Sequence, residues 1–538
     1  MVLVGRRTIG ATMRWSRQLA LLVGGAVATN GPPIRAQERV DWDVVARIRE
    51  EGFQRSQVMN LAWYMTDVLG PRVTASPSMR KAQRWAKAKM DSIGLTTSVE
   101  PFGDHEVSWD NEYTSLHLRE PDYQPLIGYP FAFTPGTEGK VVARATIAVI
   151  GTAKDFEQYR GKLRGMVVLA SSPSALAPRF AADATRFATD SLLALSRATL
   201  SSPHGVSGVP YEWDPAIHWF KPVGSRSPFD FDLAPATVQR FFKAEGAAAL
   251  VYAAAGGDGT VKVDQRPDGR FQRSYASAVS VPPMIALAPE HYNRIYRLVD
   301  RGFPAVLELE VRNILTRSDG GGQNVVGDLP GTDLADEVVM AGGHFDSWHA
   351  GTGATDDAAG AAVALEAVRI LKAIGVEPRR TIRVALWDYE EGGKVGSVRY
   401  VQKHFANRGR KTPAYDKLSV YFNMDNGSGQ FRGLYLQGNE RVRPIFTAWM
   451  EPFRDLGMTT LTINDTYATD HEAFETAGLP GFQFIQDPID YGSRAHHSNM
   501  DVYDKLVPAD LRKNAVILAS FLYHAAMRDE RIPRKLIQ

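Results

Sequence analysis

The stretch VVMAGGHFDSWHAGTGATDDAAGAAVALEAVRILKA, residues 338–373, decides the fold class of this chain. It begins with a short apolar run, crosses a loop rich in glycine, and continues after residue 358 with apolar residues at helical spacing. A buried strand followed by a helix is the repeating unit of α/β proteins. The loop between them carries the first candidate functional side chains, His344, Asp346 and Asp356.

The same alternation continues towards the C-terminus. Apolar runs typical of buried strands occur at residues 382–387, 419–424 and 481–485, with helical patterns at residues 396–405 and 443–456. This order predicts a three-layer α/β/α domain with a mixed, mostly parallel central sheet. Ligands of such sheets bind beyond the carboxyl ends of the strands, so we expect the functional residues there.

The first half of the chain has a different texture. Helical spacing covers residues 45–69 and 80–93, whereas short β-rich runs separated by long loops fill residues 130–300. We therefore predict one α/β domain in two parts, residues 37–129 and 301–538, interrupted by a mainly β unit.

The N-terminus has the order of a secretory signal. Arginines at positions 6, 7, 14 and 17 precede the apolar run 19–27, and a small residue, Ala36, follows two prolines. The alternative is a membrane anchor, but the run is shorter than the roughly 20 residues that span a bilayer. We expect residues 1–36 to direct export to the periplasm or the exterior, with no membrane association after signal removal.

Composition narrows the chemistry. The 538 residues contain 62 Lys plus Arg against 60 Asp plus Glu, a balance that offers no broad basic face for nucleic acid. There is no cysteine, which excludes disulfides, thiolate metal sites and a cysteine nucleophile. Any transition metal must therefore be held by His, Asp and Glu.

Such side chains gather in short clusters after the predicted strands. Each cluster alone has an ordinary explanation, such as a helix cap, a turn residue or a solvated acid pair. Together they predict a metal centre, because so many ligand types at successive strand ends are an unlikely coincidence. No Gly-x-Ser-x-Gly elbow follows any of the strands, which argues against a serine hydrolase. The clusters contain His344 and Asp346, Asp356 and Asp357, Glu390 and Glu391, Asp425, and His496 and His497.

The motifs GGHFDSW, GATDDAAG, EEGGKVGS, NMD and HHSNMD resemble those of the zinc aminopeptidase family that includes aminopeptidase Y and the glutamate carboxypeptidases. They are most similar to those of the plasma glutamate carboxypeptidase type. The segment at residues 130–300 correspondingly resembles a protease-associated domain inserted in the peptidase domain. The resemblance implies a metallo-exopeptidase with two zinc ions per chain that acts on short peptides or dipeptides.

Carried over residue by residue, the resemblance implies a metal role for five side chains. Asp356 would bridge the two zinc ions, His344 and Asp425 would complete one site, and Glu391 and His497 would complete the other. All five positions match the family pattern in this sequence.

Four further residues receive roles around these ligands. The resemblance makes Glu390 the general base and Asp346 the acid that orients the first histidine. His496 is a candidate for stabilising the oxyanion, with an ordinary exposed imidazole as the alternative. Asp470 precedes a short helix and is expected in the substrate pocket, with helix capping as the alternative.

Two alternative functions remain open. A glutaminyl-cyclase-like acyl transferase would use the same fold with one zinc ion, and a non-catalytic binding protein would keep the fold without the ligands. The full set of five ligands favours hydrolysis. The sequence does not decide which end of the peptide is held, although Lys394 and Arg494 are candidates for binding a carboxylate.

Overall fold

The computed structural model describes residues 38–199, 211–214, 219–222, 234–264, 274–407 and 409–535. The chain divides into two units, Met1–Arg39 and Val40–Gln538, and the fold below is that of the second. The predicted signal segment lies outside the described residues. In the described ranges we find no helix with the length and apolar character needed to cross a membrane.

The first of two large sheets has eight strands in the order β1-β14-β16-β15-β19-β22-β20-β21. Its four central strands, β16, β15, β19 and β22, run parallel, while β1 and β14 extend the sheet antiparallel on one side. The predicted mixed, mostly parallel α/β sheet is thus confirmed. The strands are β1 (Thr96–Gly103), β14 (Gly322–Leu329), β15 (Leu334–His344), β16 (Arg380–Trp387), β19 (Leu418–Asn423), β20 (Phe431–Tyr435), β21 (Thr460–Thr462) and β22 (Gly481–Gln486).

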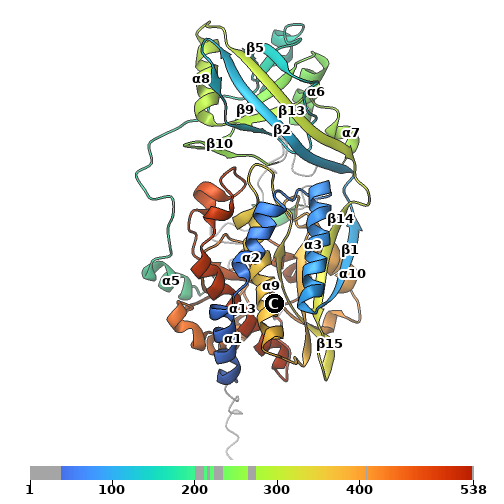
Figure 1. The fold of residues 1–538 in the computed structure, drawn as a ribbon, viewed down its shortest axis with the longest axis vertical. Coiled ribbons are helices and arrows are strands. Elements are labelled where there is room, and N and C mark those ends of the chain that lie inside the picture. Colours follow the sequence, from blue (N-terminus) through green and yellow to red (C-terminus); the bar gives the residue numbers. More distant parts are fainter. Residues whose placement is uncertain are drawn as a thin grey trace, which may run out of the picture. The chain divides into compact units, whose positions relative to one another are not determined.

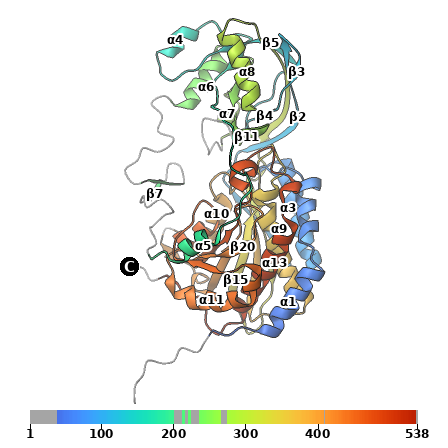
Figure 2. The same cartoon turned by 90° about the vertical axis from the view of Figure 1, so that its left-hand side faces the viewer.

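Both faces of this sheet are covered. In β15, Val339 and Ala341 belong to one apolar cluster and Met340 to another, because successive side chains of a strand point to opposite faces. Helices lie on each side of the strands (Figures 1 and 2). The first cluster takes side chains from α1 (Trp42–Gln54), α2 (Val58–Trp63), α3 (Pro77–Ile93), α9 (Ala359–Ala373), α11 (Arg443–Met450) and α13 (Pro508–Met527), and the second from α10 (Val395–His404) and α12 (His471–Thr476).

The first predicted helical stretch is broken in two. Helix α1 ends before Arg55, α2 starts at Val58, and a π-helical turn, η1 (Tyr64–Val68), follows. The backbone N–H of Gln57, between the two helices, donates to the buried carboxylate of Glu366 on α9, at 2.8 Å. Apolar spacing persists through the break because both helices pack on α9.

The second large sheet has the order β3-β2-β13-β5-β6-β9-β12-β4. Helices pack on both faces, since α6 (Pro235–Ala244) and α8 (Pro289–Asp300) contribute to different apolar clusters. The sequence predicted a mainly β unit because short strands buried on both faces give continuous apolar runs that dominate the pattern. The strands are β2 (Val107–Glu120), β3 (Gln124–Pro125), β4 (Gly128–Pro130), β5 (Val141–Ile147), β6 (Val167–Leu169), β9 (Ala249–Ala253), β12 (Met284–Leu287) and β13 (Val306–Arg317).

This sheet also extends beyond residues 130–300. Its longest pair, β2 and β13, lies outside that range and pairs antiparallel along almost its whole length. Strand β13 leads directly into β14 of the first sheet. The two sheets are therefore joined by strands and not by flexible linkers, which gives no composition change for sequence reasoning to detect.

Candidate metal centre

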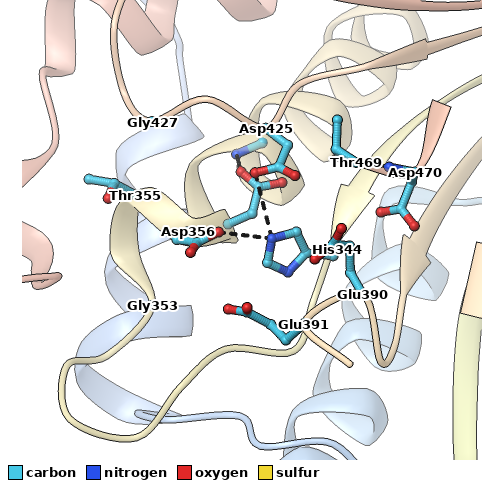
Figure 3. Close-up of polar contacts among 12 residues, drawn as sticks. His344, Gly353, Thr355, Asp356, Glu390, Glu391, Asp425, Gly427, Thr469 and Asp470 are labelled. Atoms are coloured by element: carbon cyan, nitrogen blue, oxygen red, sulfur yellow. Dashed lines mark hydrogen bonds and ion pairs between the residues drawn. The ribbon is translucent and has the colours of Figure 1, made fainter. Parts of the chain in front are cut away.

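The candidate site forms at the carboxyl ends of three parallel strands (Figure 3). His344 is the last residue of β15, the Glu390-Glu391 pair follows β16, and Asp425 follows β19. Because β15 lies between β16 and β19, these side chains meet at one edge of the sheet. The sequence predicted this convergence from strand ends alone.

Asp356 comes from the turn that leads into α9. It lies in the π-helical turn η2 (Ala354–Ala358) and is buried beside the end of β15. The approach requires glycine in the strand, since a Cβ on Gly343 would lie 2.2 Å from Oδ2 of Asp357. Gly343 of the GGH motif thus lets this turn sit against β15.

The first group of potential ligands consists of His344, Asp356 and Asp425. His344 Nε2 lies 3.0 Å from Asp356 Oδ1 and 3.6 Å from Asp425 Oδ1 (Figure 3). His344 Nδ1 lies 2.9 Å from the backbone oxygen of Asp346, an acceptor, so Nδ1 carries the proton and Nε2 faces the carboxylates. This is the orientation that a metal-binding imidazole needs.

The second group lies on the other oxygen of Asp356. His497 Nε2 is 3.3 Å from Asp356 Oδ2 and 2.8 Å from Glu391 Oε2. His496 Nε2 is 3.7 Å from the same Asp356 oxygen, and its ring stacks on His497 with centroids 3.8 Å apart. His496 thus groups with Asp356 and His497 as a potential ligand, whereas the predicted ligand Glu391 lies outside that group and contacts His497.

The acids and imidazoles of the site perturb one another. Burial alone would lower the pKa of His344, but Asp425 raises it well above its usual value. Burial raises the pKa of Glu391 to about 7. Several carboxylates lie close together in a buried site. A positive charge placed among them would reduce their mutual repulsion.

Unpaired oxygens indicate that a cation fits here. Among the described residues, Asp356 Oδ2 and Glu391 Oε1 are buried and accept no hydrogen bond. A buried carboxylate oxygen without a partner is costly unless a proton or a metal satisfies it. Histidine and carboxylate are also the ligand types that zinc takes where cysteine is absent.

Glu390 lies beside His344 and Asp470, on the other side of the imidazole from Asp356 (Figure 3). Burial raises the pKa of Glu390 well above its usual value, against the effect of His344. The carboxylate of Asp346 accepts the backbone N–H groups of Glu390 at 3.1 Å and Glu391 at 3.3 Å. Asp346 thus anchors the turn that carries both glutamates, while its carboxylate lies 3.7 Å from His344 Nδ1.

The two pocket candidates differ in their environments. Asp470 is fully buried at the start of α12, but its side chain makes no capping hydrogen bond, so the capping alternative is wrong. Burial raises the pKa of Asp470 to about 7. The His496 side chain is 41% exposed, and partial burial together with His497 lowers its pKa to about 4. His496 is therefore neutral at pH 7.

Asp501 is the last residue of the HHSNMD motif, and sequence reasoning assigned it no role. Asp501 Oδ1 accepts from Thr355 N at 2.6 Å and Thr355 Oγ1 at 2.7 Å, and Oδ2 accepts from Asp356 N at 3.2 Å. This buried acid fixes the turn that presents Asp356. Its place four residues after His497 was the only signal in the sequence.

Residues from the part of the chain that contains the second large sheet also contact the site. Val263 N donates to the backbone oxygen of His497 at 2.9 Å, and Val261 N donates to Asn499 Oδ1 at 2.7 Å. Asp264 Oδ2 lies 3.7 Å from His497 Nδ1. No sequence pattern links these segments, because they are far apart in the chain.

Lys394 and Arg494, the two candidates for binding a substrate carboxylate, both form ion pairs with acidic side chains of the protein. Lys394 is buried and pairs with Glu472. Arg494 pairs with Asp183 at 2.8 Å and lies 3.7 Å from Asp258. Both side chains therefore already have carboxylate partners within the protein.

The part of the chain that carries the site is similar to a known family of peptidases. Residues 324–522 match the family described as Peptidase family M28, which confirms the predicted resemblance over that stretch. Carboxypeptidase Q of Rattus norvegicus is 32% identical over 260 residues, which cover 48% of this chain and 53% of that protein. The chain thus spans about half the length of the curated relatives it matches.

Solved structures agree on the fold. The Peptidase M28 precursor from Shewanella amazonensis matches with a TM-score of 0.62 and 21% identity over 92% of this chain and 99% of its own. A zinc aminopeptidase from Bacillus subtilis matches with a TM-score of 0.53 and 17% identity over 88% and 95%. At these identities the likeness establishes the arrangement of the chain.

Proposed function

We propose that this protein is a zinc-dependent exopeptidase that hydrolyses the terminal bond of short peptides or dipeptides. The carrying observation is that the two oxygens of Asp356 face two different histidines, His344 at 3.0 Å and His497 at 3.3 Å. One carboxylate between two ligand groups suits a bridging role in a pair of metal sites. The carboxypeptidase Q relatives support the assignment to exopeptidases.

Five side chains would hold the metal ions. His344 and Asp425 would complete one site, Glu391 and His497 the other, and Asp356 would serve both. Two zinc ions bound there would polarise the scissile carbonyl and activate a water molecule as the nucleophile.

The remaining chemistry belongs to unligated residues. A carboxylate of Glu390 would take the proton from the attacking water and deliver it to the leaving amine nitrogen, a role that its raised pKa favours. His496, neutral at pH 7, would donate a hydrogen bond to the oxyanion. Asp470 would line the pocket beside Glu390, and Asp346 would hold the glutamate turn in place.

The organisation of the chain follows the same proposal. Residues 37–129 and 301–538 would form the peptidase domain, interrupted at residues 130–300 by a protease-associated-like insert. Residues 1–36 would direct export, which places the enzyme in the periplasm or outside the cell.

Hydrolysis assays test the proposal. Free dipeptides, N-blocked peptides and C-amidated peptides are incubated with the holoenzyme, with the chelated protein, and with the chelated protein after zinc is restored. We expect cleavage that chelation abolishes and zinc restores. Activity that survives verified zinc removal would contradict the metal mechanism.

The same panel separates the alternatives. Cleavage of N-blocked peptides identifies carboxypeptidase action, and cleavage of C-amidated peptides identifies aminopeptidase action. Cyclisation of N-terminal glutamine with a single bound zinc ion would instead support the acyl transferase. Zinc binding without turnover of any substrate would support a binding protein.

A further inference from the structure

A single arginine far from the site in sequence holds the backbone beneath it. Arg72 lies in the loop between η1 and α3, and none of its surface is exposed. Within the described residues, its guanidinium donates only to backbone carbonyls. These are Phe345 O at 2.7 Å, Met65 O at 3.1 Å, Gly70 O at 3.0 Å, Thr352 O at 2.9 Å and Gly353 O at 2.9 Å.

Three of these carbonyls belong to the loop of residues 345–353, which joins His344 at the end of β15 to the turn that carries Asp356. Phe345 follows His344 at the end of β15, whereas Thr352 and Gly353 precede Asp356. A planar guanidinium can hold several acceptors at fixed angles, which a lysine ammonium on a flexible stem cannot do. The Arg72 side chain therefore ties the end of this loop next to His344 to the end that leads to Asp356.

Backbone contacts and close packing reinforce this tie. Arg72 N donates to Ser347 Oγ, and Ser347 N donates to Arg72 O, both at 3.1 Å. A Cβ on Gly353 would lie 2.8 Å from Arg72 Nη2 and 2.2 Å from Ser347 Cβ. The guanidinium and Ser347 thus fill the space beside Gly353, so a residue with a side chain would not fit there.

Within the described part of the chain, the Arg72 guanidinium pairs with no carboxylate, although several acids lie near it. Burial lowers the pKa of Arg72 to about 10, against the effects of Asp501, Asp346, Asp357 and Asp356. It remains a cation at pH 7. A buried positive charge behind a cluster of carboxylates lowers their mutual repulsion before any metal binds.

We propose that Arg72 is a positioning residue of the metal centre, which sets the separation of His344 and Asp356 through carbonyls at the two ends of the loop between them. The inference rests on the metal site proposed above. Because it concerns ligand geometry and charge, its primary readout is metal affinity, which is independent of turnover.

Arg380 provides a matched control. It is equally buried, and it also binds backbone carbonyls, those of Arg528 and Asp529, but unlike Arg72 it pairs with an acid, Glu337, at 2.6 Å. It stands at the start of β16, at the opposite end of the sheet from Glu390. The Arg72→Lys and Arg380→Lys variants therefore both remove hydrogen bonds from a buried guanidinium to backbone carbonyls, at opposite ends of the sheet, and a lysine at position 380 can still pair with Glu337.

The experiment measures zinc affinity by competition with a chelator, alongside the thermal midpoint of each metal-free protein. We expect both variants to lose thermal stability, but only Arg72→Lys to bind zinc more weakly, by roughly 10 to 100 fold. Unchanged affinity in Arg72→Lys, or equal weakening in both variants, would overturn the inference. A parent protein that binds no zinc would instead refute the metal site itself.

Ser347→Ala keeps the inference testable if Arg72→Lys does not fold. This variant removes the hydrogen bond that the backbone nitrogen of Arg72 donates to Ser347, in the loop after His344, and leaves the guanidinium in place. We expect a smaller fall in zinc affinity in the same direction. Parental affinity in Ser347→Ala would then count against Arg72 as a positioning residue.

Discussion

Asp501 holds Thr355 by two hydrogen bonds to one oxygen, 2.6 Å from the backbone nitrogen and 2.7 Å from the hydroxyl. The next residue, Asp356, is the proposed bridging ligand, and its N–H also points at Asp501. The position of the bridge thus depends on an acid that is itself buried from solvent.

Asp501→Asn tests this dependence. An amide turned with its NH₂ group towards these donors leaves at least one unsatisfied, at a cost of about 1 to 3 kcal/mol in the free energy of unfolding. We expect lower thermal stability and weaker zinc binding. Asp504→Asn, at an exposed position three residues away, should leave both quantities at parental values. Parental zinc affinity in Asp501→Asn would refute the positioning role.

Glu390→Gln separates proton transfer from metal binding. Without a carboxylate to accept the proton, we expect turnover to fall by roughly 10² to 10⁴ fold, with zinc content unchanged. Glu391→Gln should lose zinc, because the adjacent acid is a proposed ligand. Kinetics and metal analysis on both variants check the assignment, and full activity in Glu390→Gln would exclude it as the base.

The proposed pair of metal sites predicts different metal losses from two aspartates. Asp356 faces both histidines, whereas Asp425 lies beside His344 only. Asp356→Asn should therefore lose zinc from both sites and Asp425→Asn from one. Metal analysis after dialysis against a weak chelator measures this difference. Equal zinc content in the two variants would contradict the bridging role.

Much of this site could be predicted because it is built on strand ends. Apolar runs identified β15, β16 and β19, and parallel strands bring the residues after them to one edge. The order of side chains along the chain therefore carried spatial information. The residue types, with no cysteine available, then pointed to a metal.

The supporting residues could not be predicted for a physical reason. Arg72 looks like any surface arginine in the sequence, and its burial depends on carbonyls of loops far away in the chain. Asp264 reaches His497 from the other large sheet's unit. Such contacts follow from tertiary packing, which hydrophobic periodicity does not encode.

Lys394 is buried, and its ion pair with the buried carboxylate of Glu472 explains how the interior accommodates this cation. Lys394→Leu would leave that acid buried without its cation, and we expect a loss of about 3 to 5 kcal/mol in the free energy of unfolding. The double variant Lys394→Leu/Glu472→Leu should recover part of the loss. Denaturant titrations measure the cycle, and a double variant less stable than Lys394→Leu would refute the explanation.

Glu100 provides a pH dependence away from the metal site. It joins β1 to α10 through Lys403 and His404, each 2.7 Å from its Oε2. Burial alone would raise the pKa of Glu100, but its contacts with His404 and Lys403 lower it from 4.5 to about 2. A lowered pKa in the folded state stabilises the protein above pH 4.5, and the contribution disappears as the pH falls towards 2.

Glu100→Gln should therefore lower the free energy of unfolding at pH 7 by about 1 to 3 kcal/mol, less than the full shift implies because the carboxylate is partly exposed. The difference from the parent should shrink as the pH falls below about 4.5. Denaturant titrations of the metal-free proteins from pH 7 downwards measure it, since zinc release would otherwise add its own pH dependence. Glu138→Gln, at an exposed position, should follow the parent throughout. A difference between Glu100→Gln and the parent that stays constant with pH would mean that packing, and not the charge of Glu100, joins β1 to α10.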